Sequence, residues 1–277
     1  MPQYVALSKI TKEFTFALAA EGKRVDGRAF DQFRPITIKT RFVKKAEGSA
    51  EVHLGHTRVL CGVKLKPGVP YPDAPDAGTM TTSAEMNPLA APDFEAGPPR
   101  PEAIELARVV DRGVRESGLI DFKKLCEKVG ETVWTVFIDI HVLDYDGNLF
   151  DACSMAALAA VLTAKVPRVQ YKIGDKDVPL PLTTTEPPIS ATVAKIGNSL
   201  MIDPNLDEDL VFDARLTVAC DVEGNIRAMQ KGGSGSFSVD EVRKIIKMGQ
   251  SGSALIRAAI HEAVAKGEAS VGAKPEA

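Results

Sequence analysis

Residues 132–164 have the sequence TVWTVFIDIHVLDYDGNLFDACSMAALAAVLTA, and this stretch decides the fold. Thr132–Leu143 is rich in β-branched and aromatic residues, which favour a strand. Tyr145-Asp146-Gly147-Asn148 is typical of a tight turn. Asp151–Ala164 is alanine-rich and apolar on nearly every face, so the helix that it predicts is buried and packs closely on a sheet. The stretch therefore predicts a strand, a turn and a buried helix.

Further strands are predicted on both sides of this unit. Before it, apolar or alternating runs separated by glycine-containing turns predict antiparallel strands, and Pro101 opens a helix that runs to about residue 117. After it, a second group of strands precedes a long helix from Ser238, which forms a capping-box pattern with Glu241. We expect that helix to end at Lys266-Gly267. The predicted strands are Ile36–Phe42, Ser49–Leu54, Arg58–Leu65, Thr79–Met86, Ile189–Lys195, Ser199–Ile202, Val211–Cys220 and Asn225–Met229.

The fold class that follows is α+β, with mixed β-sheets and packed helices in βαβα-type units. We expect an N-terminal helix and connector in residues 1–24 and a first domain in residues 25–185. A second domain should occupy residues 186–267, and residues 268–277 should form a flexible tail.

The composition is that of an ordinary globular protein, with 44% hydrophobic and 26% charged residues among 277. No stretch approaches the roughly 18 consecutive apolar residues of a membrane span. The first residues lack the features of a signal peptide, so we expect a cytoplasmic protein without a membrane partner. Because the net charge is −3, any nucleic-acid site must be a local basic patch. The four cysteines are far apart and mostly flanked by apolar residues, which suits buried packing better than disulfides or metal ligands.

Three arginines lie on one face of the helix predicted from Pro101. At about 100° per residue, Arg108, Arg112 and Arg115 fall in a narrow stripe, with apolar residues on the opposite face. Like charges at this spacing destabilise an isolated helix by roughly 0.2–0.5 kcal/mol per pair. Their stacking therefore suggests an anionic partner such as spaced phosphates. The alternative is a solvated face balanced by neighbouring acidic residues.

Two other segments carry groups that could take part in chemistry. The acidic stretch Asp203–Asp209 could supply a general acid or bind Mg²⁺, or it could be a solvated loop between strands. Lys231–Ser236 could cradle a phosphate with its backbone amides, or it could be a flexible connector. The four histidines have no metal-ligand spacing with cysteine or acidic residues, so we expect no metal site.

Several motifs complete the picture. Arg24-Val25-Asp26-Gly27-Arg28 marks the RNase PH superfamily, while Ile104–Arg112 and Ile202–Glu208 mark one subunit type within it. Together these motifs resemble the RNase PH superfamily, and specifically its non-catalytic archaeal exosome ring subunit, over about residues 20–265. The resemblance implies an RNase PH-like fold with two RNase PH-like domains. It also includes Glu47-Gly48-Ser49-Ala50, Gly55-His56-Thr57 and Leu143-Asp144-Tyr145-Asp146-Gly147-Asn148.

The resemblance implies a hexameric ring of three heterodimers, in which catalytic and non-catalytic subunits alternate beneath RNA-binding cap proteins. Such a ring degrades single-stranded RNA from its 3′ end with inorganic phosphate. Catalytic relatives hold that phosphate with a Gly-Ser/Thr-Arg turn at the start of the buried helix. The matching turn here, Gly147-Asn148-Leu149, lacks both the hydroxyl and the guanidinium, so phosphate should bind only in the partner's active site and no residue here should be catalytic. Arg108, Arg112 and Arg115 would contact the RNA backbone beside that active site.

Two alternatives stay open. Asp203 and Asp209 keep the spacing of the catalytic aspartates in active relatives, so the chain could itself be an active phosphorolytic 3′–5′ exoribonuclease. It could instead be a purely structural ring subunit, with its arginines in salt bridges between subunits. Neither alternative requires a cofactor other than inorganic phosphate.

Overall fold

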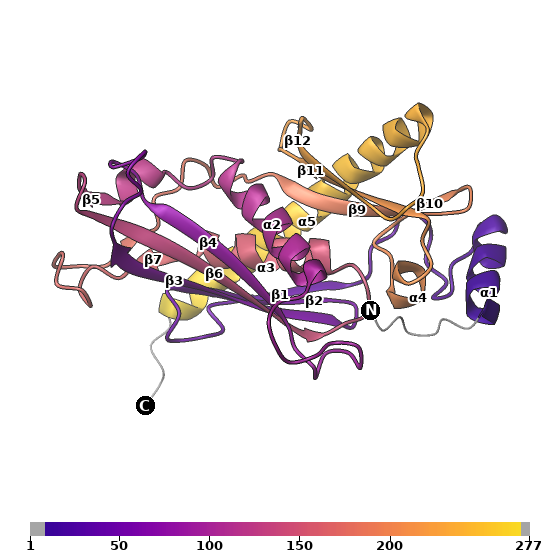
Figure 1. The fold of residues 1–277 in the computed structure, drawn as a ribbon, viewed down its shortest axis with the longest axis horizontal. Helices are drawn as coiled ribbons and strands as arrows, with labels where there is room; N and C mark the ends of the chain where they lie inside the picture. The colour runs from indigo at the N-terminus through magenta and orange to yellow at the C-terminus, as the bar shows by residue number, and fades with distance from the viewer. Residues whose placement is uncertain (1–8, 273–277) are drawn as a thin grey trace.

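The computed structural model describes residues 9–272, with the side chains of residues 10–267. Its centre is helix α3 (Leu149–Leu162), which packs against one sheet through β2 and β3 and against a second sheet through β9. Figure 1 shows α3 between the larger sheet, in purple, and the smaller sheet, in orange. Residues 149–161 are all buried. This environment explains why the helix is apolar on nearly every face, and it confirms the central prediction from the sequence.

The larger sheet has the strand order β1-β2-β3-β6-β4, and β5 pairs with β6. β4 runs parallel to β6 and all other neighbours are antiparallel, so the sheet is mixed as predicted. The parallel pair requires a crossover, which α2 provides. The elements are β1 (Ile36–Thr40), β2 (Gly48–Leu54), β3 (Thr57–Gly68), β4 (Thr79–Met86), α2 (Pro101–Arg115), the 3₁₀ helix η1 (Phe122–Leu125), β5 (Cys126–Lys128) and β6 (Thr132–Asp144).

The smaller sheet is antiparallel throughout, with the order β10-β9-β11-β12. Helix α5 packs on β9 and β11 and reaches β1, so it joins the two sheets. A short ribbon of β7 and β8 lies apart. The elements are β7 (Lys165–Val166), β8 (Val178–Pro179), β9 (Ile189–Ile196), β10 (Ser199–Ile202), α4 (Leu206–Asp209), β11 (Ala214–Cys220), β12 (Ile226–Gly232) and α5 (Val239–Gly272).

Helix α5 begins as predicted but ends later. The Ser238 amide donates to the Glu241 carboxylate at 2.6 Å, and the Glu241 amide donates to Ser238 Oγ at 3.3 Å, which is the predicted capping box. The predicted end at Gly267 is wrong, because the helix continues to Gly272. A Cβ at position 267 would collide with Thr40 of β1. Gly267 therefore permits a close approach to the sheet and does not cap the helix.

One continuous hydrophobic core joins the two sheets, because residues of β2, β3, β6, β9, β11, α3 and α5 belong to the same buried cluster. Cys61, Cys153 and Cys220 are buried as predicted, Cys126 is half-buried, and all four are free thiols. At the other end of the chain, helix α1 (Lys9–Ala20) lies near α4. Residues 1–8, which belong to the predicted N-terminal helix and connector, and residues 273–277 of the predicted tail lie outside the described residues. Within residues 9–272, no helix is long and apolar enough to cross a membrane.

Candidate functional site

Helix α2 presents the predicted arginine stripe to solvent. Ala103, Leu106, Val110 and Val114 are buried, and the helix packs on β4 and α3. Arg108, Arg112 and Arg115 are all exposed on the other side. The predicted division of the helix into a packed face and an arginine face is therefore present in the structure.

The three arginines are not equivalent. Arg115 donates to the Asp111 carboxylate at 2.9 and 3.1 Å and to the Met80 carbonyl at 2.8 Å. Hydrogen bonding and charge from Asp111 raise the pKa of Arg115 further above its ordinary value. Arg108 and Arg112 have no hydrogen bond or ion pair through their side chains with any residue that the structure describes. Two guanidinium groups are therefore available to a ligand, and the third is held in place.

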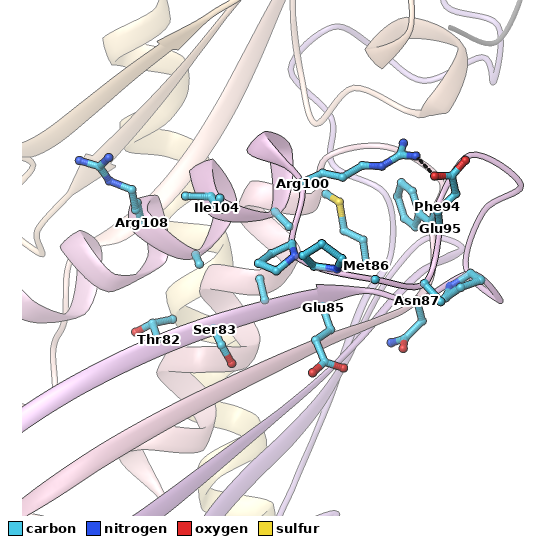
Figure 2. A pocket seen from close by; sticks show the side chains of 18 residues that line it. Thr82, Ser83, Glu85, Met86, Asn87, Phe94, Glu95, Arg100, Ile104 and Arg108 are labelled. Atoms are coloured by element: carbon cyan, nitrogen blue, oxygen red, sulfur yellow. Dashed lines mark hydrogen bonds and ion pairs between the residues drawn. The ribbon is translucent and has the colours of Figure 1, made fainter. Parts of the chain in front are cut away.

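Two hollows lie along this helix where it faces β4. One hollow, of about 630 Å³, lies between β4, residues 87–100 and the first half of α2. Figure 2 shows Arg108 at one end of it and Arg100, paired with Glu95, at the other. A second hollow, of about 350 Å³, lies between β4 and α2 and is lined by Arg108, Arg112 and Arg115 together. A chain of phosphates would thus have room beside the arginines.

The acidic stretch is not a solvated loop. Asn205 caps the short helix α4 by accepting from the Glu208 amide at 3.1 Å, and Glu208 is itself buried. The Arg24 guanidinium donates to the Glu208 carboxylate at 2.8 Å and to the Ile202 carbonyl at 2.9 Å. The Glu208 carboxylate, one of the acidic groups that the sequence suggested for Mg²⁺ binding or proton donation, is thus paired with an arginine inside the protein.

Asp203 is saturated with donors. Arg34 donates to it through its backbone amide at 2.9 Å, through Nε at 2.9 Å and through Nη2 at 2.7 Å. Arg28 Nη1 and Asn148 Nδ2 add bonds of 3.0 and 2.8 Å. Burial works to raise the pKa of Asp203, but hydrogen bonding and charge from Arg34 more than offset burial and lower it. The group stays ionised and bound on both oxygens, so it is poorly placed to exchange a proton with a substrate.

Asp209 has different partners although it lies only six positions later. It is half-buried and accepts a hydrogen bond from the Tyr145 hydroxyl at 2.8 Å. Burial raises its pKa, while the bond from Tyr145, the charge of Arg215 and the backbone of Asn148 oppose that rise. The Asp209 carboxylate therefore lies against the turn that begins α3. The two aspartates keep the spacing that the resemblance gives to a catalytic pair, and Asn148 contacts both, Asp203 through its side chain and Asp209 through its backbone.

The turn Gly147-Asn148-Leu149 is used for internal contacts. Gly147 has φ of +85°, and a Cβ there would collide with the backbone of Asn205. Asn148, also in the left-handed region with φ of +50°, is buried and caps α3 by accepting from the Asp151 amide. Its Nδ2 donates to the carboxylates of Asp151 and Asp203, at 2.8 Å each. At the turn that the resemblance matches to a phosphate site, this chain has an asparagine that donates to its own carboxylates.

Asp151 is a buried residue that the sequence reasoning missed. It is fully buried in the first turn of α3, and burial raises its pKa to about 7. It accepts from the Thr192 amide at 2.9 Å and contacts the Thr192 hydroxyl at 2.8 Å, which joins α3 to β9. The sequence did contain a signal for it, because Asp151 is an acidic residue in an otherwise apolar helix. The buried network that joins Asp151 to Asp203 through Asn148 also includes three arginines, Arg24, Arg28 and Arg34. Of these three, Arg34 belongs to no motif that the sequence indicated.

The glycine-rich segment after β12 packs on the protein. The Gly235 amide donates to the Asp213 carbonyl at 2.7 Å, and Lys231 Nζ donates to the Gly233 carbonyl at 2.6 Å. A Cβ at Gly233 or Gly235 would also collide with the Asp213 backbone. The segment is thus neither an open phosphate cradle nor a loosely held connector.

Comparison with known proteins places this site in a family. The model of the 3′ exoribonuclease family, domain 1, matches residues 32–167, and the model of domain 2 matches residues 186–252. The chain is 49% identical over 251 residues to the exosome complex component Rrp42 of Methanocella arvoryzae, which covers 91% of this chain and 95% of that protein. It is 53% identical over 241 residues to the exosome complex component Rrp42 of Thermococcus gammatolerans, with coverage of 85% and 88%.

Solved structures agree with these matches. A chain of the Archaeoglobus fulgidus exosome with RNA bound to the active site has a TM-score of 0.86 at 44% identity, covering 90% of this chain and 96% of that chain. A chain of an archaeal exosome core has a TM-score of 0.84 at 40% identity, with coverage of 94% and 100%. These matches confirm the predicted RNase PH-like fold and the resemblance to an archaeal exosome subunit. With both domains matched in order along it, the chain belongs to the RNase PH family of 3′ exoribonucleases.

Proposed function

We propose that this chain is a non-catalytic, RNA-binding subunit of an archaeal exosome core ring. In this proposal it alternates with a catalytic RNase PH-like subunit in three heterodimers, beneath RNA-binding cap proteins, and shapes its partner's active site for phosphate-dependent 3′-to-5′ degradation of single-stranded RNA. The similarity to Rrp42 subunits and to an exosome structure with bound RNA supports the setting. The observation that carries the proposal is the arginine face of α2.

The arginine face fits an RNA backbone. Arg108 and Arg112 are exposed and unpaired among the described residues, and Arg115 is fixed beside them by Asp111. Guanidinium groups bind phosphate oxygens in a planar, two-bond arrangement without regard to base sequence. A degradative enzyme needs such contacts, since its substrate changes sequence at every step. We therefore assign Arg108, Arg112 and Arg115 to positioning the 3′ end.

The absence of catalysis in this chain is supported by the groups around α3. The turn that would hold phosphate ends in a buried leucine, and Asn148 is engaged with two carboxylates. Without a bound nucleophile, a nearby acid has no reaction to assist. Asp203 is also locked by Arg34 and Arg28. These contacts speak against the alternative that Asp203 and Asp209 act as catalytic residues.

The test is phosphate-dependent shortening of a single-stranded RNA by the purified chain, alone and mixed with its catalytic relative. We expect nucleoside diphosphate release only from the mixture. Release by the isolated chain would overturn the proposal and favour Asp203 and Asp209 as catalytic groups.

The salt dependence of RNA binding by a variant without the three arginines, the arginine-face variant, tests this assignment. Each phosphate contact on a single strand contributes about 0.7 to the slope of log affinity against log salt, so three lost contacts should reduce that slope by about 2. The matched control removes three exposed positive charges from α5, and should leave the slope unchanged. Disassembly of the ring by the arginine-face variant would favour the purely structural alternative. The variant is Arg108→Ala/Arg112→Ala/Arg115→Ala, and the α5 control is Arg243→Ala/Lys244→Ala/Lys247→Ala.

A further inference from the structure

A second concentration of positive charge lies at the loop between β1 and β2, away from α2. Two adjoining hollows, of about 510 and 310 Å³, share Lys44, Ala46, Glu47 and Lys165 in their linings. None of the residues that line the hollows beside α2 takes part. We call this surface the basic groove. Its positive side chains are Arg41, Lys44, Lys45, Lys64 and Lys165.

The positive charge of the basic groove is only partly balanced. Lys64 is paired with Glu47 at 2.6 Å. Lys44, Lys45 and Lys165 are exposed, and their side chains have no ion pair or hydrogen bond with any part of the chain that the structure describes. Asp177 is the other carboxylate in the lining. The C-terminal end of α3 adds about half a negative charge. Positive charge therefore remains in excess here, in a chain whose net charge is −3.

The frame of the basic groove is fixed by packing. A Cβ at Gly48 would collide with the Ala160 carbonyl, so only glycine lets the loop lie this close to the end of α3. Ser49 Oγ accepts from the Val43 amide at 2.8 Å, and the Lys165 amide donates to the Glu47 carbonyl at 3.1 Å. The lysines thus project from a backbone that is already in place. Binding an extended anion would cost little ordering of the loop.

Arg41 is the strained residue of this loop. Its φ is +58°, a left-handed conformation that is strained for a residue with a side chain. Its Nε is buried and has no hydrogen-bond partner among the described residues. A buried donor without an acceptor is unfavourable, because it has given up its hydrogen bonds to water. An anionic oxygen in the adjoining hollow, which Arg41 lines, would supply the acceptor.

The lining indicates the class of ligand. Its polar side chains are lysines, an arginine, Ser49, Thr163 and Gln170 beside the two carboxylates, its few apolar side chains are small, and it contains no aromatic residue. Protein interfaces usually anchor on buried tryptophan, tyrosine or other large side chains. Phosphate contacts use lysine, arginine and hydroxyl groups. We propose that the basic groove binds the phosphate backbone of single-stranded RNA, as a contact separate from the arginine face. This inference rests on the proposed function only in taking RNA as the ligand.

The test is the salt dependence of RNA binding by the full chain, measured by fluorescence anisotropy with a labelled oligoadenylate. Removing the three unpaired lysines should reduce the slope of log affinity against log salt by about 2, for three phosphate contacts. Replacing the same lysines by arginine should preserve the slope, and so should the α5 control. The groove variant is Lys44→Ala/Lys45→Ala/Lys165→Ala, and its charge-preserving counterpart is Lys44→Arg/Lys45→Arg/Lys165→Arg.

The outcomes separate this inference from the proposed function. A groove variant with an unchanged slope, alongside an arginine-face variant with a reduced one, overturns the inference and leaves the function standing. The reverse pattern supports the groove and overturns the assignment of Arg108, Arg112 and Arg115. If polyglutamate competes with the RNA at equal affinity, and the groove variant loses polyglutamate binding too, the ligand is an acidic protein segment and the RNA assignment fails. Unchanged circular dichroism should show that each variant is folded.

Discussion

Replacing Asp203 by asparagine keeps the size of the side chain and removes the charge that Arg34 and Arg28 share. Loss of one partner from a buried ion pair costs roughly 3–5 kcal/mol, because the other charge is left uncompensated. Arg34 keeps a second carboxylate, since its Nη1 lies 3.3 Å from Asp146. We therefore expect the lower end, about 3 kcal/mol. For a chain of this size each kcal/mol lowers the melting temperature by about 2–4 °C, so the midpoint should fall by roughly 6–12 °C.

The matched control is Asp209→Asn. Asp209 is half-buried, lacks a bound arginine among the described residues, and accepts from the Tyr145 hydroxyl and the Asn148 backbone amide, so its replacement should cost only about 1–2 kcal/mol. Urea unfolding followed by circular dichroism at pH 7 compares the two variants. If Asp203→Asn stays within about 0.5 kcal/mol of the unmodified chain, the account of Asp203 as a structural anion is refuted.

The stability difference should also depend on pH. The pKa of Asp203 is lowered in the folded state, so its contribution is present above the unfolded pKa of about 4 and is lost as the pH falls through the folded pKa. The gap between the unmodified chain and Asp203→Asn should therefore be constant from about pH 5 to 8. It should close as acid protonates the folded carboxylate. A gap that widens toward low pH would contradict this sign.

Three further changes probe the same region. Asp151 has a pKa raised to about 7, so stability should fall as pH rises from about 4 to 7, and Asp151→Asn should flatten that fall in urea titrations across this range. Gly147→Ala forces a side chain into a left-handed, filled position and should lower the melting temperature sharply or abolish soluble expression. Asn148→Ser/Leu149→Arg introduces the residue types that the resemblance associates with a phosphate-binding turn, but it removes a donor to Asp203 and places a cation at a buried position. It should melt earlier and show no phosphate-dependent diphosphate release from the isolated chain.

The long elements follow from the sequence because local pattern and tertiary environment agree in them. Thr132–Asp144 is a strand by residue type, and α3 is apolar all round because two sheets and two helices enclose it. The structure differs from the sequence-based expectation where one residue type can serve two purposes. Gly267 has the signature of a helix end, yet it is glycine because β1 lies close against α5. Local propensity cannot distinguish these two causes.

The candidate site could be predicted only in part. The arginine stripe on α2 depends on helical spacing alone, so the sequence was enough to place its three arginines on one face. Which of them are unpaired depends on Asp111 and on the Met80 carbonyl of β4, a contact made in three dimensions. Arg34 and Asp203 are 169 positions apart and meet only when the two sheets pack together. Composition made the acidic stretch seem solvated, whereas tertiary contacts bury it.

The same contacts link the proposed absence of catalysis to the stability of the fold. A phosphate site at the start of α3 needs free amides and cations facing outward. Here Asn148 faces inward, and its one amide nitrogen donates to Asp151 of α3 and to Asp203 of the segment after β10. Arg34 adds a donor to the Gly147 carbonyl at 3.4 Å. The Asn148 side chain cannot also bind phosphate, because turning it outward would leave the carboxylates of Asp151 and Asp203 short of a donor. Asp203 and Asp209 therefore have the spacing of a catalytic pair, although their contacts serve to join the two halves of the protein.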